Sequence, residues 1–158
     1  MDALKSLFSD FDFAAFIPQL DTVLGWIELV ARLAVMAGPL FLLGFGLIYL
    51  LVPPKEANHI AGYRFWWGMA SLDAWQFTQK LAGMVWSALG LVLTIVMALI
   101  CNGFRNQAPM DMVWSAVSCL LWELGLAGAA SLGINITVMV VFDKYGFRRK
   151  EYVNENEE

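Results

Sequence analysis

Glu123 is the first candidate for chemistry, because it stands where an ion is costly. It lies between Trp122 and Leu124, within the almost unbroken apolar sequence of residues 112–142. A carboxyl group in such surroundings must face other helices, be paired or be protonated, so it would bind a proton, a cation or a peptide amine. The alternative is a surface carboxylate near the lipid headgroups, with a membrane span that begins only at Leu124.

Arg64 is the second candidate, in a polar connector rich in aromatic residues. Its planar guanidinium can bind an anionic headgroup or a peptide carboxylate. The alternative is an arginine that only reaches up to the headgroups as an anchor. Nearby, Trp66, Trp67 and Trp75 predict an aromatic belt at the membrane surface.

Other kinds of chemistry find little support. His59 is the only histidine, and we expect it to be solvated in a loop, so we expect no metal site and no cofactor. The sequence contains no Ser-His-Asp set, no glycine-rich phosphate loop and no paired catalytic carboxylates. We therefore do not expect an enzyme.

Three uncharged stretches of 19 or 20 residues must position these side chains: Leu33–Val52, Leu81–Ile100 and Leu124–Phe142. A helix rises about 1.5 Å per residue, so each stretch can cross a hydrocarbon core of about 30 Å. The 158 residues are 59% hydrophobic and only 15% charged, too little charge to cover a water-soluble surface. The sequence predicts an all-α membrane protein with three transmembrane helices.

The N-terminal residues 1–20 differ from the spans, because apolar residues recur there every three or four positions among charged ones. This pattern predicts an interfacial amphipathic helix, which Pro18 would end. Asp21 and Thr22 would then cap the first spanning helix. We expect a three-span membrane domain over residues 21–150 and an acidic tail over residues 151–158.

Further residues predict how the spans begin, bend and end. Pro39 should bend the first span, and Ser71 or Asp73 could cap the helix that enters the second. The apolar region 112–142 is too long for one perpendicular span, so we favour one long tilted helix. A break near Glu123 is the alternative.

Small residues and pairs suggest contacts between the helices. Gly125, Ala129 and Gly133 form a small-xxx-small seam, which should pack on another span or on a second copy of the chain, so a homodimer is one candidate partner. Cys101 and Cys119 lack metal-ligand spacing, and we expect both to be free packing residues.

The distribution of basic residues predicts the orientation. With three spans, the first connector and the C-terminus share one side. That side carries seven basic residues: Lys55, Arg64, Lys80, Lys144, Arg148, Arg149 and Lys150. The other side carries three: Lys5, Arg32 and Arg105. We therefore expect the C-terminus in the cytoplasm and the N-terminus outside.

The first connector also carries a motif. An asparagine is followed four residues later by Gly-Tyr-Arg, then by a tryptophan that opens a helix, with a glycine eight residues beyond. This pattern resembles the SdpI-type membrane proteins, and the matching positions are Asn58, Gly62, Tyr63, Arg64, Trp75 and Gly83. The resemblance covers roughly residues 35–105. Thr78 and Gln79 stand where that family commonly has an asparagine.

The resemblance implies a non-catalytic, multi-pass protein of a bacterial cell membrane, in a family whose named members confer immunity to a secreted toxin peptide and help to signal its presence. The implied partners are membrane lipids and a toxin peptide or another membrane protein, with no nucleic acid. Alternative functions are a small transport or lipid-handling subunit, or an accessory subunit of a larger membrane complex. We predict that Asn58, Tyr63 and Arg64 cluster at the cytoplasmic interface, and we add Glu123 as a ligand contact.

Overall fold

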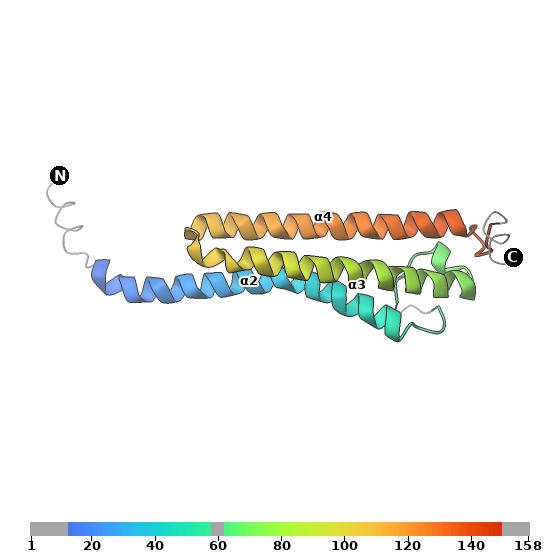
Figure 1. Cartoon of the computed structure of the whole chain (residues 1–158), viewed down its shortest axis with the longest axis horizontal. Coiled ribbons are helices and arrows are strands. Elements are labelled where there is room, and N and C mark those ends of the chain that lie inside the picture. Colours follow the sequence, from blue (N-terminus) through green and yellow to red (C-terminus); the bar gives the residue numbers. More distant parts are fainter. Residues whose placement is uncertain (1–12, 58–61, 150–158) are drawn as a thin grey trace.

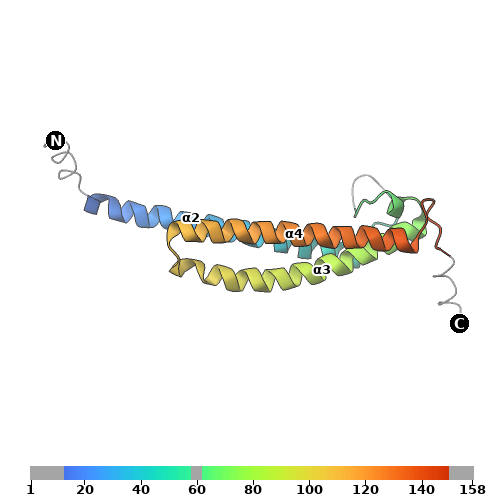
Figure 2. The same ribbon diagram turned by 90° about the horizontal axis from the view of Figure 1, so that it is seen from above.

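The computed structural model describes residues 13–57 and 62–149, with side chains described from Thr22 onward. Three long helices and two short 3-10 helices make up this part of the chain: α2 (Phe13–Leu51), η1 (Trp67–Met69), α3 (Leu72–Asn102), η2 (Phe104–Asn106) and α4 (Pro109–Val141). The long helices lie side by side, and α3 runs antiparallel to α2 and α4 (Figures 1 and 2). The prediction of an all-α fold is confirmed.

All three helices are long and apolar enough to cross a membrane. The candidate spans cover 30, 35 and 33 residues, at Thr22–Leu51, Leu72–Asn106 and Pro109–Val141. At about 1.5 Å per residue each is longer than a hydrocarbon core of about 30 Å, so the helices must tilt or extend into the headgroup layers. The first turns of α2 project beyond the rest of the bundle (Figure 1).

The N-terminal helix differs from the prediction. Residues 13–20 are the first turns of α2 and not a separate interfacial helix, and neither Pro18 nor Asp21 and Thr22 mark a boundary. Proline removes one backbone hydrogen bond, and the apolar sequence on both sides continues the helix in spite of that loss. Residues 1–12 and the acidic tail lie outside the described residues.

The middle of α2 agrees better with the prediction. The helix continues through Pro39, and its second half slopes away from α4 in Figure 1. An ion pair lies near its entrance, where Arg32 Nη2 is 2.6 Å from Glu28 Oε1. The helix ends at Leu51, directly before Val52 and two prolines.

The closest helix contact joins α2 and α3 through glycines. A Cβ atom at Gly83 would lie 2.9 Å from the backbone nitrogen of Leu50 and 3.1 Å from the carbonyl oxygen of Gly46. At Gly46 an added Cβ would overlap the backbone of Ser87. Only glycine lets the two backbones come so near, and this contact explains why the motif ends in Gly83.

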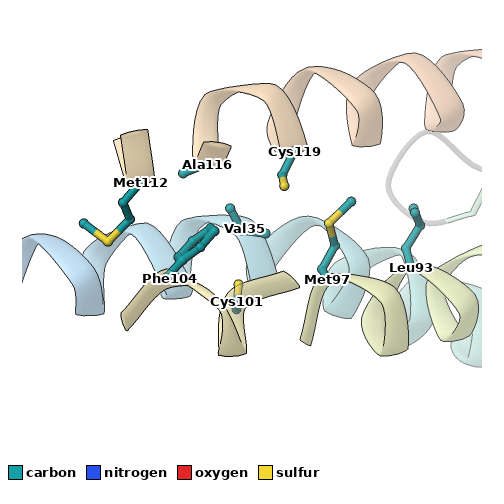
Figure 3. Close-up of a cluster of buried hydrophobic side chains, with 8 residues drawn as sticks. All are labelled: Val35, Leu93, Met97, Cys101, Phe104, Met112, Ala116 and Cys119. Atoms are coloured by element: carbon teal, nitrogen blue, oxygen red, sulfur yellow. The ribbon is translucent and has the colours of Figure 1, made fainter. Parts of the chain in front are cut away.

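A cluster of eight buried residues fills the space between the helices at the η2 end (Figure 3): Val35, Leu93, Met97, Cys101, Phe104, Met112, Ala116 and Cys119. Both cysteines are buried and free, as predicted. Two smaller clusters lie at the other end, around Tyr63 and Ile134 and around Ala74 and Phe142. The polar middle of α4, at Glu123, lies between these cores.

Helix α4 is one continuous helix from Pro109 to Val141, so the prediction of a single long helix is confirmed. Its small-residue seam does not pack against other described parts of the chain. Gly125, Ala129 and Gly133 are exposed, and a Cβ added at either glycine would meet nothing within 4 Å among the described residues. Packing of this seam on a second copy stays a prediction.

Candidate functional site

The peptide unit of Tyr63 is held by the side chain of Gln79. The Tyr63 backbone N–H donates to Gln79 Oε1 at 2.7 Å, and Gln79 Nε2 donates to the Tyr63 carbonyl at 2.9 Å. Gln79 has no solvent-exposed surface, so both bonds are shielded from water, and each polar group satisfies another that would be costly to bury alone. The amide thus fixes the connector on α3.

Gly62 makes this docking possible. Its φ of +105° lies in the left-handed region, which residues with a Cβ rarely adopt. A Cβ there would lie 2.8 Å from Trp75 Cζ2 and 2.9 Å from Gln79 Oε1. The motif therefore requires glycine for both conformation and space.

Trp75 anchors the start of the same connector. Its Nε1 donates to the Pro54 carbonyl at 2.8 Å, and the side chain is fully buried. The prediction that Trp75 belongs to a surface belt is therefore wrong, because its N–H donates to the partly buried Pro54 carbonyl and its ring packs against Gly62. Trp66, with 77% of its surface exposed, keeps the character of a belt residue.

The side chain of Tyr63 links the connector to α4. Its hydroxyl lies 2.8 Å from Asn135 Oδ1 and 3.1 Å from the Ser131 carbonyl, and its ring meets Trp86 edge-on at a centroid distance of 5.3 Å. Burial raises the pKa of Tyr63, against the smaller lowering effect of the bonds to Ser131 and Asn135, so the phenol stays a neutral donor.

The remaining motif residues are placed differently. Asn58 lies outside the described residues, so its part in the predicted cluster stays a prediction. Arg64 is exposed while its neighbour Tyr63 is buried, so the two side chains take separate directions. Arg64 does interact with its surroundings, and its charge acts on the Tyr49 hydroxyl.

A family comparison covers the same part of the chain. The model of the SdpI/YfhL protein family matches residues 55–142, which is more than half of the chain and includes the connector, α3 and α4. The chain belongs to the SdpI/YfhL family. Searches among curated proteins and among solved structures found no match.

In this SdpI/YfhL-family protein, the ordered motif adjoins a basic cavity of about 280 Å³. The cavity lies between the end of α2 and the start of α3, and its lining comprises Tyr49, Leu50, Pro53, Pro54, Lys55, Gln76 and Lys80. Two lysines from separate elements give it a positive charge suited to a phosphate group. Sequence reasoning counted these lysines for orientation but did not bring them together.

Glu123 lies far from the motif, in the middle of α4. Only 5% of the residue is exposed, and its Oε1 has no hydrogen-bond partner among the described residues. Its Oε2 lies against α2, because a Cβ built at Gly38 would be 2.6 Å away from it. The carboxyl group faces a cavity of about 250 Å³ that is lined otherwise by Gly38, Leu42, Leu120, Leu124 and Ala127. Of the two sequence interpretations, burial within the helical bundle describes Glu123.

A larger groove of about 440 Å³ runs between α2 and α4, towards the η2 end. Its lining is entirely apolar: Val23, Trp26, Ile27, Val30 and Ala31 from α2, with Val113, Ala116, Val117 and Leu120 from α4. Leu120 lines both this groove and the cavity of Glu123. The two hollows therefore adjoin at Leu120, along the seam of α2 and α4.

Two of the residues that build the motif site were missed in the sequence. Gln79 was noted only as standing where the family commonly has asparagine, and that position was the available signal for its role. Asn135 is not among the residues that the sequence singles out, and it accepts the hydrogen bond of the Tyr63 hydroxyl from 72 residues away. No local pattern indicates so distant a partner.

Proposed function

We propose that this protein protects its host cell against a membrane-active peptide by binding the peptide inside the membrane. The proposal takes its direction from the family, whose named members confer immunity to a secreted toxin peptide. The observation that carries it in this chain is the groove between α2 and α4. A protein without catalytic machinery can protect by binding alone, and such binding needs a surface that an apolar peptide segment can fill.

The chemistry of the groove suits a membrane-embedded occupant. Every lining residue is apolar, so the groove offers nothing to a polar ligand. Lipid tails are as apolar as leucine, so an occupant gains over lipid through close packing and not through the hydrophobic effect. Trp26, with 63% of its surface exposed, provides a broad rigid wall for such packing.

In the predicted orientation, this groove lies towards the outer face of the membrane. The basic residues favour a cytoplasmic first connector and C-terminus, so the opposite end, with η2 and the groove, faces outwards. A secreted peptide that enters the membrane from outside would meet the groove first.

The test compares filling the groove with an equal change elsewhere. Val30 lines the groove and is 61% exposed, whereas Val92, on α3, is 57% exposed and lines no part of it. Cells without the gene, challenged with a panel of membrane-active peptides, should be more sensitive to at least one of them. Wild type and Val92→Trp should restore resistance, and Val30→Trp should not.

Two results would count against the proposal. One is unchanged sensitivity of the deletion strain across the whole panel. The other is full resistance with Val30→Trp at normal protein levels, which would show that the groove is not where a peptide acts.

A second candidate function, lipid handling, is favoured by the basic cavity. Lys55 and Lys80 line it from two elements, at an end of the bundle that the span lengths would place near the phosphate headgroups. Reconstitution in vesicles would test this: movement of labelled anionic lipid between leaflets should fall in Lys55→Gln/Lys80→Gln. Unchanged movement in that double variant would remove the support.

A further inference from the structure

We infer that Glu123 is an amine-binding site at the inner end of the groove, and that it takes an ammonium group from an apolar amphiphile or peptide that lies in the groove. The inference rests on the proposed function for the identity of the natural ligand. The amine site itself depends only on the geometry around Glu123.

The first argument is the incomplete environment of the carboxyl group. Only 5% of Glu123 is exposed, and its Oε1 has no hydrogen-bond partner among the described residues. The thiols Cys119, on α4, and Cys101, on α3, are buried and free in the adjoining apolar cluster and carry no positive charge. Arg32, whose charge acts on Cys101, is already paired with Glu28.

An unpaired carboxyl group inside a bilayer needs a proton or a positive partner, because hydrocarbon cannot solvate its charge. A leucine at position 123 would pack against Gly38 and Leu42 without this requirement. The groups on α2 that face it, Gly38 and Leu42, are uncharged. The fold thus leaves the carboxyl group available to a ligand.

The lining of the cavity decides between kinds of cation. Metal ions such as Na⁺ or Ca²⁺ need several oxygen ligands around them, and Glu123 is the sole lining residue with a side-chain oxygen. An ammonium group needs fewer acceptors, since it offers three N–H donors in a compact head. The five apolar lining residues suit the aliphatic chain that carries such a head.

The groove supplies the route. Leu120 borders both hollows, and Glu123 follows it by one helical turn on α4, on the same side of the helix. A peptide segment packed in the groove would therefore bring a lysine side chain or its terminal amine to the carboxyl group. The groove contributes packing, and Glu123 contributes selectivity for an amine.

The test measures access to Glu123 from the lipid. The protein in lipid nanodiscs is treated with dicyclohexylcarbodiimide, an apolar reagent for protonated membrane carboxyls, and labelled residues are found by mass spectrometry. Dodecylamine and dodecanol compete with the reagent, and any amide that dodecylamine forms at the activated Glu123 carboxyl group, with release of dicyclohexylurea, is counted as labelled. We expect labelling at Glu123, slowed about tenfold by dodecylamine at ten times its Kd, since about a tenth of the sites then stay free. Dodecanol should have little effect.

The variants separate the site from general damage. Glu123→Gln should lose the label, whereas Asp111→Asn, which alters an exposed carboxyl group in the first turn of α4, should keep labelling and protection. Equal protection by dodecanol and dodecylamine would overturn the inference, because the cavity would then select only for an apolar chain. Absence of labelling at Glu123 in the wild type would also overturn it.

The experiments distinguish a failure of the amine site from a failure of the proposed function. Amine-selective protection together with loss of cellular resistance in Glu123→Gln supports the whole inference. If protection is amine-selective but Glu123→Gln cells stay fully resistant, the peptide does not use this carboxyl group, and that part of the inference is wrong. If the deletion strain shows no sensitivity, the proposed function fails while the amine site stands.

Discussion

Gly62 combines a left-handed backbone conformation with a lack of space for any side chain. Its φ is +105°, and an added Cβ would overlap the indole of Trp75. We predict that Gly62→Ala lowers the free energy of unfolding by about 2–4 kcal/mol, through backbone strain and displacement of Trp75. Thermal unfolding in mild detergent would measure this loss.

The matched control is Gly25→Ala, since Gly25 lies in α2 and a Cβ there would meet nothing within 4 Å. Alanine favours a helix more than glycine does, so this variant should be as stable as the wild type or slightly more. Similar stability of the two variants would show that the connector does not depend on the Gly62 conformation.

The hydroxyl of Tyr63 is a second single group on which the fold depends, because its hydrogen bonds link the connector to α4. In Tyr63→Phe, Asn135 loses its 2.8 Å partner while staying half-buried. We predict a loss of about 1–2 kcal/mol in the free energy of unfolding. Tyr145→Phe is the control, since Tyr145 is 63% exposed, and it should leave the unfolding midpoint unchanged. An equal midpoint in both variants would argue against the link.

At the scale of residues, the sequence was enough to find the motif but not to predict which contacts hold its residues in place. Gly62, Tyr63 and Trp75 were selected as candidates, yet the burial of Trp75 was not foreseen. The reason is physical: the N–H of Trp75 is satisfied by the Pro54 carbonyl, 21 residues away. Tertiary partners of this kind leave no periodic trace in the sequence.

At the scale of elements, Ser71 joins the start of α3 to the C-terminal turn. Its hydroxyl accepts from the Ala74 N–H at 3.1 Å as an N-cap and donates to the Gly146 carbonyl at 2.7 Å. Close by, Arg148 pairs with Asp73 at 2.8 Å. The residues after α4 therefore fold back onto α3, on the side of the bundle that holds the motif.

We predict that Ser71→Ala costs about 1–2 kcal/mol of stability, since it removes a helix cap and a tertiary hydrogen bond together. Ser118→Ala is the comparison, because the exposed Ser118 bonds only to the Trp114 carbonyl within α4. Hydrogen exchange at the first turn of α3 and at residues 143–149 should rise in Ser71→Ala. Faster exchange in only one of these two segments would show that they are not coupled.

Helix ends were predictable where a cap or a double proline set them, as at Ser71 and after Leu51. They were not predictable where a single proline met a long apolar run. Pro18 was expected to end a helix, but α2 passes through it. One lost hydrogen bond is a small cost in a helix of 39 residues whose neighbouring backbone bonds remain intact.

At the scale of the whole molecule, the two ends of the bundle have different characters. One end carries the connector motif, the basic cavity and the C-terminal turn, all tied by hydrogen bonds. The other end carries the apolar groove and the buried cysteines, with Glu123 between the two. The ordered end suits a fixed platform near headgroups, and the groove suits exchange of an apolar ligand, so the protection that we propose depends on which end faces outwards.

Orientation is the last prediction, and it follows from seven basic residues on the side of the first connector against three on the other. Single cysteines would report it, after Cys101 and Cys119 are replaced by alanine. Gln107, between η2 and α4, and Tyr145, after α4, are exposed at opposite ends of the bundle. A membrane-impermeant maleimide should label Gln107→Cys in intact cells, and Tyr145→Cys only in opened cells. The reverse pattern would place the groove in the inner leaflet, where a peptide arriving from outside would reach the basic cavity first.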